Sequence, residues 1–147
     1  MKYISKSLEE TRETAEQFVK TLEIGEKARV VALTGNLGSG KTAFSQAVGS
    51  TLGVIENMAS PTFVIEKIYP IDYHGFKHLI HIDAYRLDYS KELLHLGWQK
   101  IISERENLIL IEWPERVVDI IPKGVQNIFF KFVDETTREI DIYESEN

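Results

Sequence analysis

The stretch Gly35-Asn36-Leu37-Gly38-Ser39-Gly40-Lys41-Thr42 decides the fold, because it joins a strand pattern to a helix pattern. It matches G-x-x-x-x-G-K-[ST], a loop whose backbone N–H groups and following helix N-terminus surround phosphate oxygens. In such a loop the lysine reaches the β- and γ-phosphates, and the hydroxyl of the last residue ligates magnesium. A glycine turn with a chance Lys-Thr is the alternative, which the flanking patterns disfavour. The stretch therefore predicts a P-loop whose eight residues bind ATP and Mg²⁺, with Lys41 on the phosphates and Thr42 on the metal.

The segments on either side of the loop carry the patterns that a P-loop requires. Residues 29–33 form an almost continuous aliphatic run, which is typical of a strand buried on both faces. After the loop, apolar residues recur at helical spacing, and Gly53 is placed to end the helix. These apolar residues are Phe44, Ala47, Val48 and Leu52. The result is a strand, a glycine-rich loop and a helix in the order of a P-loop unit.

The rest of the chain predicts two more helical segments and five more strands. A capping box at Ser7 begins an amphipathic helix that extends toward Gly25, and a second helix is interrupted at Gly97. The strands of a first hairpin are separated by a loop that contains Pro70, Asp72 and Gly75. The predicted segments are a helix over 91–103 and strands over 63–69, 78–83, 108–112, 127–133 and 138–143.

This order of elements indicates an α/β fold, a P-loop NTPase-like three-layer domain. Its sheet is expected to be mixed and mainly parallel, with helices flanking both faces. The length of 147 residues falls within the usual range of one domain, so we expect 1–147 to form a single P-loop domain.

Composition limits the possible functions. With 43% apolar and 27% charged residues the chain is an ordinary globular protein, and without cysteine it excludes disulfides, zinc ribbons and thiol catalysis. No signal segment and no run of about 20 apolar residues is visible, so we expect a cytoplasmic protein without a membrane anchor. The net charge of −6, without a basic stripe, disfavours direct and strong tRNA binding.

A P-loop needs an acidic residue near the metal, at the end of a neighbouring hydrophobic strand. Glu112 ends the run 108–111 and Asp83 ends the run 79–82. We assign Glu112 to magnesium and Asp83 to orienting or activating the attacking water, and the exchange of these two roles stays open. His81 shares a strand face with Asp83, so it is interpreted as a residue that supports the site. Trp113, beside the metal carboxylate, is placed to cover the site or to face a partner.

The segment Ser60-Pro61-Thr62-Phe63 lies between the P-loop helix and the next strand, where many P-loop proteins have a nucleotide-sensing switch. A hydroxyl at this place is suited to sense the γ-phosphate. Ordinary turn chemistry explains Ser-Pro equally well from the sequence alone.

Five motifs together resemble the TsaE (YjeE) family over nearly the whole chain. They are G-N-L-G-S-G-K-T, S-P-T-F, H-I-D-A-Y-R-L, E-L-L-H-L-G and I-E-W-P-E, in this order. The resemblance implies an ATPase that works with the TsaD–TsaB heterodimer, which transfers a threonylcarbamoyl group to the adenosine beside the tRNA anticodon. It implies that this chain contacts tRNA only indirectly, through that complex.

The resemblance also assigns roles to individual residues. Lys41 and Thr42 fall on the phosphate and magnesium positions of the family, Glu112 on its second magnesium position and Asp83 on its proposed catalytic acid. Thr62 falls on the family's switch, so Asp83, Lys41 and Thr62 form the expected catalytic set. Two further residues are expected to bind the nucleotide: Thr11, near the base, and Arg138, where the family often has Arg-Glu.

Two other function classes use the same loop. A small-molecule P-loop kinase needs an acceptor pocket and an arginine-bearing lid, for which this chain leaves little room. A module that binds ATP without hydrolysing it would lack a water-activating group. We therefore expect an ATPase that is slow alone and stimulated by its partners.

Overall fold

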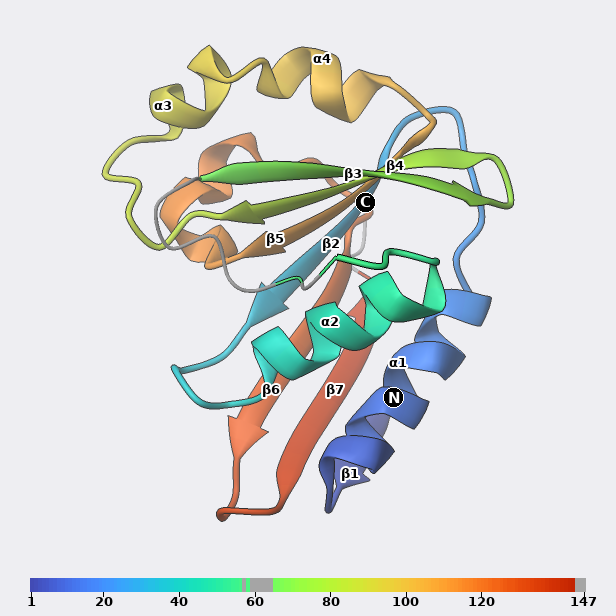
Figure 1. The fold of residues 1–147 in the computed structure, drawn as a ribbon. Coiled ribbons are helices and arrows are strands. Elements are labelled where there is room, and N and C mark those ends of the chain that lie inside the picture. Colours follow the sequence, from blue (N-terminus) through green and yellow to red (C-terminus); the bar gives the residue numbers. More distant parts are fainter. Residues whose placement is uncertain (57, 59–64, 145–147) are drawn as a thin grey trace.

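The computed structural model describes residues 1–147 except 57, 59–64 and 145–147, and Figure 1 shows its course. The strands are β1 (Lys2–Ser5), β2 (Arg29–Thr34), β3 (Glu66–Tyr73), β4 (Phe76–Asp83), β5 (Asn107–Glu112), β6 (Gln126–Phe132) and β7 (Arg138–Glu144). The helices are α1 (Leu8–Lys20), α2 (Lys41–Thr51), α3 (Ser90–His95), α4 (Trp98–Ser103) and the 3₁₀ helix η1 (Pro114–Ile120).

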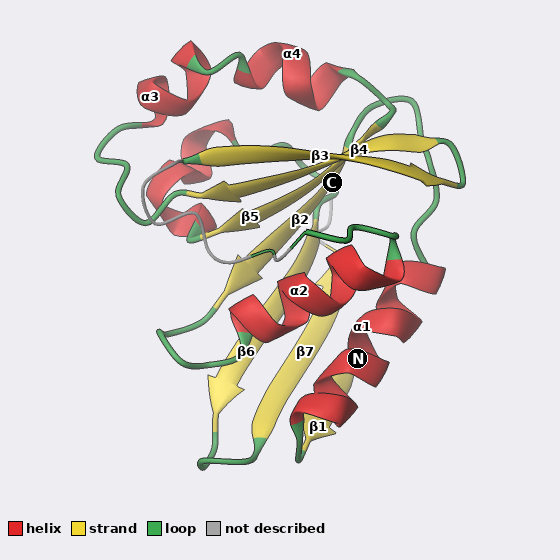
Figure 2. Cartoon of the chain, in the orientation of Figure 1, coloured by secondary structure: helices red, strands yellow, loops and turns green. Residues whose placement is uncertain are grey.

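The strands form one seven-stranded sheet in the order β1-β7-β6-β2-β5-β4-β3, which Figure 2 shows in yellow. Its four central strands, β6, β2, β5 and β4, are parallel to their neighbours within this group. The outer pairs β3–β4, β6–β7 and β1–β7 are antiparallel. The predicted α/β fold with a mixed sheet is therefore confirmed, and the parallel strands form its centre.

Helices cover the sheet on both faces, and each face has its own hydrophobic core. Alternate residues of β2 divide between the two, because Val31 and Leu33 lie in the core under α1 and α2, while Val30 and Ala32 lie in the other. The first core contains an aromatic chain in which Phe44 lies 5.9 Å from Phe18 and 5.4 Å from Phe130 between ring centroids. In Figure 1, α1 and α2 lie on one side of the sheet and α3 and α4 on the other.

Local signals in the sequence account for where several elements begin and end. At the start of α1 the Ser7 hydroxyl accepts a hydrogen bond from the Glu10 amide at 3.1 Å, and the Glu10 carboxylate accepts one from the Lys6 amide at 2.8 Å. Gly97 adopts a φ of 85° between α3 and α4, which confirms the predicted interruption. The predicted C-terminal hairpin is present as β6 and β7.

Three local features differ from the sequence prediction. A short strand, β1, precedes α1 and pairs with β7, so the sheet gains an edge strand that the sequence did not indicate. Pro70, expected in a loop, lies within β3 near a register shift, which the sheet tolerates because β3 is an edge strand. Pro114 begins η1 instead of simply breaking the chain.

The described helices are short, and α1, with 13 residues, is the longest of them. None of the helices in the described residues has the length and apolar composition that crossing a membrane requires.

Trp98 is a large buried side chain of the second core, so its substitution tests how much this core contributes to the free energy of unfolding. Its side chain is fully buried, and its indole Nε1 donates to the carbonyl oxygen of Ile120 at 3.1 Å. We expect Trp98→Ala to lower the free energy of unfolding by about 3–5 kcal/mol and Trp98→Phe by less, measured by urea denaturation. Tyr89→Ala, at an exposed aromatic residue, should change it by less than about 0.5 kcal/mol. A loss below about 1 kcal/mol for Trp98→Ala would contradict this assignment.

Candidate functional site

The predicted P-loop connects the end of β2 to the start of α2. Gly38 and Gly40 adopt φ values of 77° and 109°, which favour glycine. At Gly35 the need is spatial, because an added Cβ would lie 2.6 Å from the Ser39 hydroxyl and 2.8 Å from the Phe130 carbonyl oxygen. The glycines therefore permit a tight turn that no other residue type would follow as easily, directly before a helix N-terminus.

Lys41, the first residue of α2, is held close to this loop. Its side chain is buried, and its ammonium Nζ donates to the Gly35 carbonyl oxygen at 2.6 Å. Burial lowers the pKa of Lys41, while attraction from Glu112, Glu115 and Asp83 acts in the opposite direction. The ammonium thus lies in an acidic environment at the mouth of the loop.

The two predicted carboxylates end adjacent parallel strands. Asp83 of β4 and Glu112 of β5 are register partners, and Glu112 in turn pairs with Leu33 of β2, the strand that leads into the P-loop. The Tyr85 amide donates to Asp83 Oδ1 at 3.0 Å, and burial raises the pKa of Asp83. Because carboxyl ends of parallel strands meet at one edge of a sheet, the loop and both carboxylates share that edge.

His81 contacts the more buried of these carboxylates. Its Nε2 lies 2.6 Å from Glu112 Oε2, and the two side chains are only 1% and 3% exposed. His81 lies two residues before Asp83 on β4, so both side chains face the same side of the strand. The interpretation of His81 as a supporting residue is therefore matched by a direct contact with Glu112, which fixes one carboxylate oxygen.

Trp113 follows Glu112 and lies against Lys41. The Lys41 Nζ is 3.8 Å from the centroid of the indole ring, and the ring centroid of Tyr85 is 5.0 Å away from that of Trp113. The sequence placed Trp113 beside the metal carboxylate but gave no signal for the contact with Lys41, since the two residues are far apart in the chain. Glu115, the last residue of the I-E-W-P-E motif, received no role from the sequence, although the structure places its charge where it attracts Lys41.

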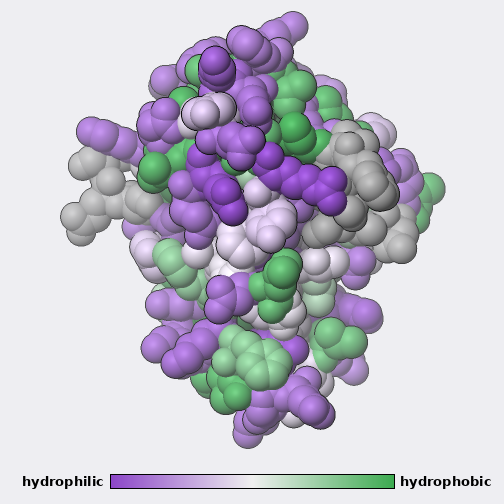
Figure 3. All heavy atoms as spheres, turned by 90° about the vertical axis from the view of Figure 1, so that its left-hand side faces the viewer, coloured by the Kyte–Doolittle hydropathy of each residue, from purple (hydrophilic) through white to green (hydrophobic). Residues whose placement is uncertain are grey.

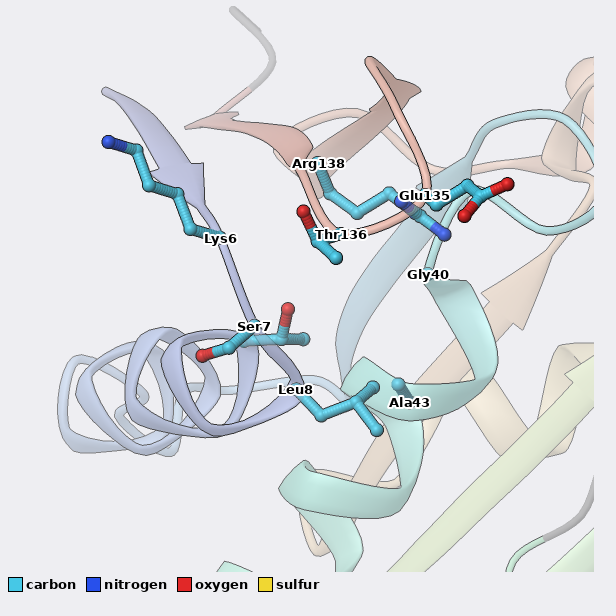
Figure 4. Close-up of a pocket in the computed structure, with 9 residues that line it drawn as sticks. Lys6, Ser7, Leu8, Gly40, Ala43, Glu135, Thr136 and Arg138 are labelled. Carbon is cyan, nitrogen blue, oxygen red and sulfur yellow. The ribbon is translucent and has the colours of Figure 1, made fainter.

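A cavity lies beside the P-loop on the α1 side. It is lined by residues from the β1–α1 junction, the start of α2 and the β6–β7 turn, which Figure 4 shows from close by. Thr11, Gly40 and Arg138 all line it, so the two residues expected near the nucleotide come together at the loop. The Arg138 guanidinium donates to the Asp134 and Thr137 carbonyl oxygens and lies 4.6 Å from the Phe132 ring centroid.

The remaining predicted residues divide into two groups. Thr42 lies in the first turn of α2 and is exposed, beside the loop as expected. Thr62 and the other predicted switch residues lie outside the described residues. Figure 3 views the carboxyl edge of the central strands, where a pale centre of intermediate hydropathy lies among hydrophilic side chains and smaller hydrophobic groups.

Comparisons with known proteins show a family model and several relatives that are similar to most of this chain. Residues 5–140 match the family model described as "Threonylcarbamoyl adenosine biosynthesis protein TsaE". The chain is 32% identical over 142 residues to the tRNA threonylcarbamoyladenosine biosynthesis protein TsaE of Treponema pallidum, covering 97% of this chain and 99% of that one. It is 35% identical to the protein of the same name from Borreliella burgdorferi, covering 81% and 82% of the two chains.

A solved structure is similar over the whole chain. The crystal structure of Bacillus subtilis YdiB aligns with a TM-score of 0.77 and 25% identity, covering 100% of this chain and 86% of that one. The fold of the described residues is therefore shared with this protein.

The tight packing of Gly35 can be tested without any ligand. We expect Gly35→Ala to lower the free energy of unfolding by about 1–3 kcal/mol, because its Cβ meets backbone at Phe130 that cannot move freely. Gly25→Ala is the matched control, since a Cβ there meets nothing within 4 Å, and it should be neutral or slightly stabilising. Equal unfolding midpoints and slopes of the two variants in urea would contradict this explanation.

Proposed function

The chain belongs to the TsaE family, and on this premise we propose that it binds ATP with magnesium at the P-loop and hydrolyses it in support of tRNA threonylcarbamoyladenosine biosynthesis. The proposal rests on one observation: Lys41 of the P-loop lies at the same edge of the sheet as the carboxylates of Glu112 and Asp83, which attract it. A small-molecule kinase would share the loop, but nothing in the described residues specifically favours it.

The donor set suits magnesium. Mg²⁺ prefers oxygen ligands and commonly uses one or two protein oxygens together with substrate phosphates. Thr42 supplies a hydroxyl and Glu112 a carboxylate, of which one oxygen is held by His81. When bound, the metal would supply positive charge against the phosphate oxygens. We assign Thr42 and Glu112 to it.

The phosphates would bind on the backbone amides of residues 35–40, at the N-terminus of α2, with Lys41 on the β- and γ-phosphates. From there a nucleoside would reach the cavity beside Gly40, which supports the assignment of Thr11 to the base and of Arg138 to nucleotide binding. Because Gly40 of the loop also lines this cavity, the position of the cavity supports a nucleotide that extends from the loop into it.

Asp83 is the proposed proton acceptor for the attacking water. The water oxygen forms a bond to the γ-phosphorus, the bond to the β–γ bridging oxygen breaks, and the water proton passes to the carboxylate. Burial raises the pKa of Asp83, and a carboxylate with a raised pKa accepts a proton more readily. Thr62 is proposed as the residue that senses the γ-phosphate.

We further propose that the chain acts on the TsaD–TsaB heterodimer and meets tRNA only through that complex. The net charge of −6 supports this division, because a protein that binds RNA strongly by itself normally carries a basic surface. Tyr85, whose amide donates to Asp83, is 43% exposed, which supports the approach of a partner to this part of the site.

The P-loop assignment predicts the effect of two substitutions. Lys41→Ala should abolish ATP binding, because it removes the charge placed against the β- and γ-phosphates. Thr42→Ala should mainly weaken the magnesium-dependent part of the affinity. Calorimetry with ATP, with and without magnesium, measures both, and Lys20→Ala at the end of α1 is the control. Unchanged affinity in Lys41→Ala would refute the site.

The two carboxylates should be separable by their substitutions. Glu112→Gln should raise the magnesium concentration that binding requires, whereas Asp83→Asn should leave ATP binding nearly intact and lower hydrolysis by about 10²–10⁴-fold. Because Asp83 must be deprotonated and its pKa is raised, hydrolysis should be lost as pH falls through a value above the usual aspartate range. If Asp83→Asn loses the magnesium dependence instead, the two roles are exchanged.

Partner dependence is tested by phosphate release. The chain alone should turn over slowly and the TsaD–TsaB heterodimer should stimulate it, by as much as about 10³–10⁵-fold if the partner adds a cation at the γ-phosphate. Asp83→Asn and Thr62→Ala should abolish or reduce the stimulated rate. A chain that hydrolyses ATP at full speed alone, and ignores the heterodimer, would contradict partner activation and favour the kinase.

A further inference from the structure

The indole of Trp113 is an unusual partner for a P-loop lysine. The Lys41 Nζ lies 3.8 Å from the ring centroid, within the range of a cation–π interaction, while it also donates to the Gly35 carbonyl oxygen. Both contacts are made with neutral groups. Each attracts the ammonium without cancelling its charge, so the positive charge stays available to a phosphate.

Charged groups nevertheless surround this ammonium. Glu112, Glu115 and Asp83 all attract it electrostatically, and of these Glu112 and Asp83 belong to the proposed metal and water sites. A lysine side chain is flexible and would form a close ion pair with such a carboxylate unless another contact held it. An ion pair of that kind would neutralise both partners, and phosphate and magnesium would have to break it.

The backbone at Trp113 shows that the ring position is specified. Trp113 has φ 59° and ψ 49°, a left-handed conformation that a bulky residue rarely adopts, and it precedes Pro114. The conformation lies at the junction of β5 and η1, and the ring packs against Tyr85 at 5.0 Å between centroids. Surrounding packing thus maintains a backbone geometry that brings the ring to Lys41.

We propose that Trp113 is a positioning residue for Lys41: its ring holds the ammonium at the P-loop, beside the Gly35 carbonyl oxygen. The inference rests on the proposed ATP site and adds to it a residue that acts through the lysine. Tryptophan suits this role because it offers the most favourable aromatic face to a cation.

Fluorination of the indole tests the electrostatic part of the contact. Fluorine atoms weaken the negative face of the ring while changing its size little, so mono-, di- and trifluorotryptophan placed at position 113 alone form a graded series. We expect the Kd for ATP to rise stepwise, by about two- to tenfold over the series, in EDTA as well as with magnesium. A merely structural role for Trp113 would not follow the number of fluorine atoms.

Ordinary substitutions supply the controls. Trp113→Phe should retain part of the affinity and Trp113→Leu less, while Tyr89→Leu removes an exposed ring that lies 5.8 Å from Lys91 Nζ and should leave the Kd unchanged. A Kd for ATP that stays constant over the fluorinated series would overturn the inference. A Kd that falls with fluorination would overturn it too, because the ring would then compete with phosphate. Absence of ATP binding in the unmodified chain would instead refute the proposed function.

Discussion

A buried ammonium is the constraint around which the site is built. Removing a lysine from water is costly unless its charge is compensated, and burial accordingly lowers the pKa of Lys41. The loop supplies one carbonyl oxygen, from Gly35, and the β5–η1 junction supplies the face of Trp113. The carboxylates of Asp83 and Glu112, at the ends of β4 and β5, attract the ammonium electrostatically. A phosphate at the loop would complete this set of partners, so the same arrangement that attracts the ammonium prepares it for an anion.

The order of the strands determines which groups reach that ammonium. In the sheet, β2 lies between β5 and β6, and β4 lies beyond β5. The carboxyl ends of these parallel strands therefore place the P-loop, Glu112 and Asp83 side by side along one edge of the sheet, in this order. The antiparallel strand β7 then returns along β6, and its first residue, Arg138, lines the cavity beside Gly40. Parallel pairing therefore positions the proposed phosphate end of the site, and antiparallel pairing positions the cavity at its other end.

Sequence reasoning found the parts whose causes are local. The P-loop has a fixed pattern of glycines, the buried strands are continuous aliphatic runs, and Gly97 marks the break between α3 and α4. It missed β1, whose four residues are ordered by pairing with β7, far away in the chain. It also placed Pro70 in a loop, because only the position of β3 at the sheet edge makes proline acceptable there. The contact of Lys41 with Trp113 depends on the left-handed backbone conformation of Trp113, which no sequence pattern indicates. What escaped prediction was thus long-range or conformational, whereas the chemistry-bearing residue types were visible.

Two carboxylates in register on adjacent strands would be nearly equivalent if only strand position mattered, yet their surroundings differ. Glu112 is almost fully buried, and its Oε2 is hydrogen-bonded to His81 Nε2, which holds that oxygen in place. Asp83 is half-buried, is bonded by the Tyr85 amide, and has a pKa that burial raises. An oriented carboxylate is suited to a metal that demands fixed geometry, and a carboxylate with a raised pKa is suited to accepting a proton. Environments that differentiate two similar acids in this way are a common basis for dividing roles in an active site. The division that supports Glu112 as metal ligand and Asp83 as base therefore arises from the neighbours of each residue, His81 above all, and not from the strand ends themselves.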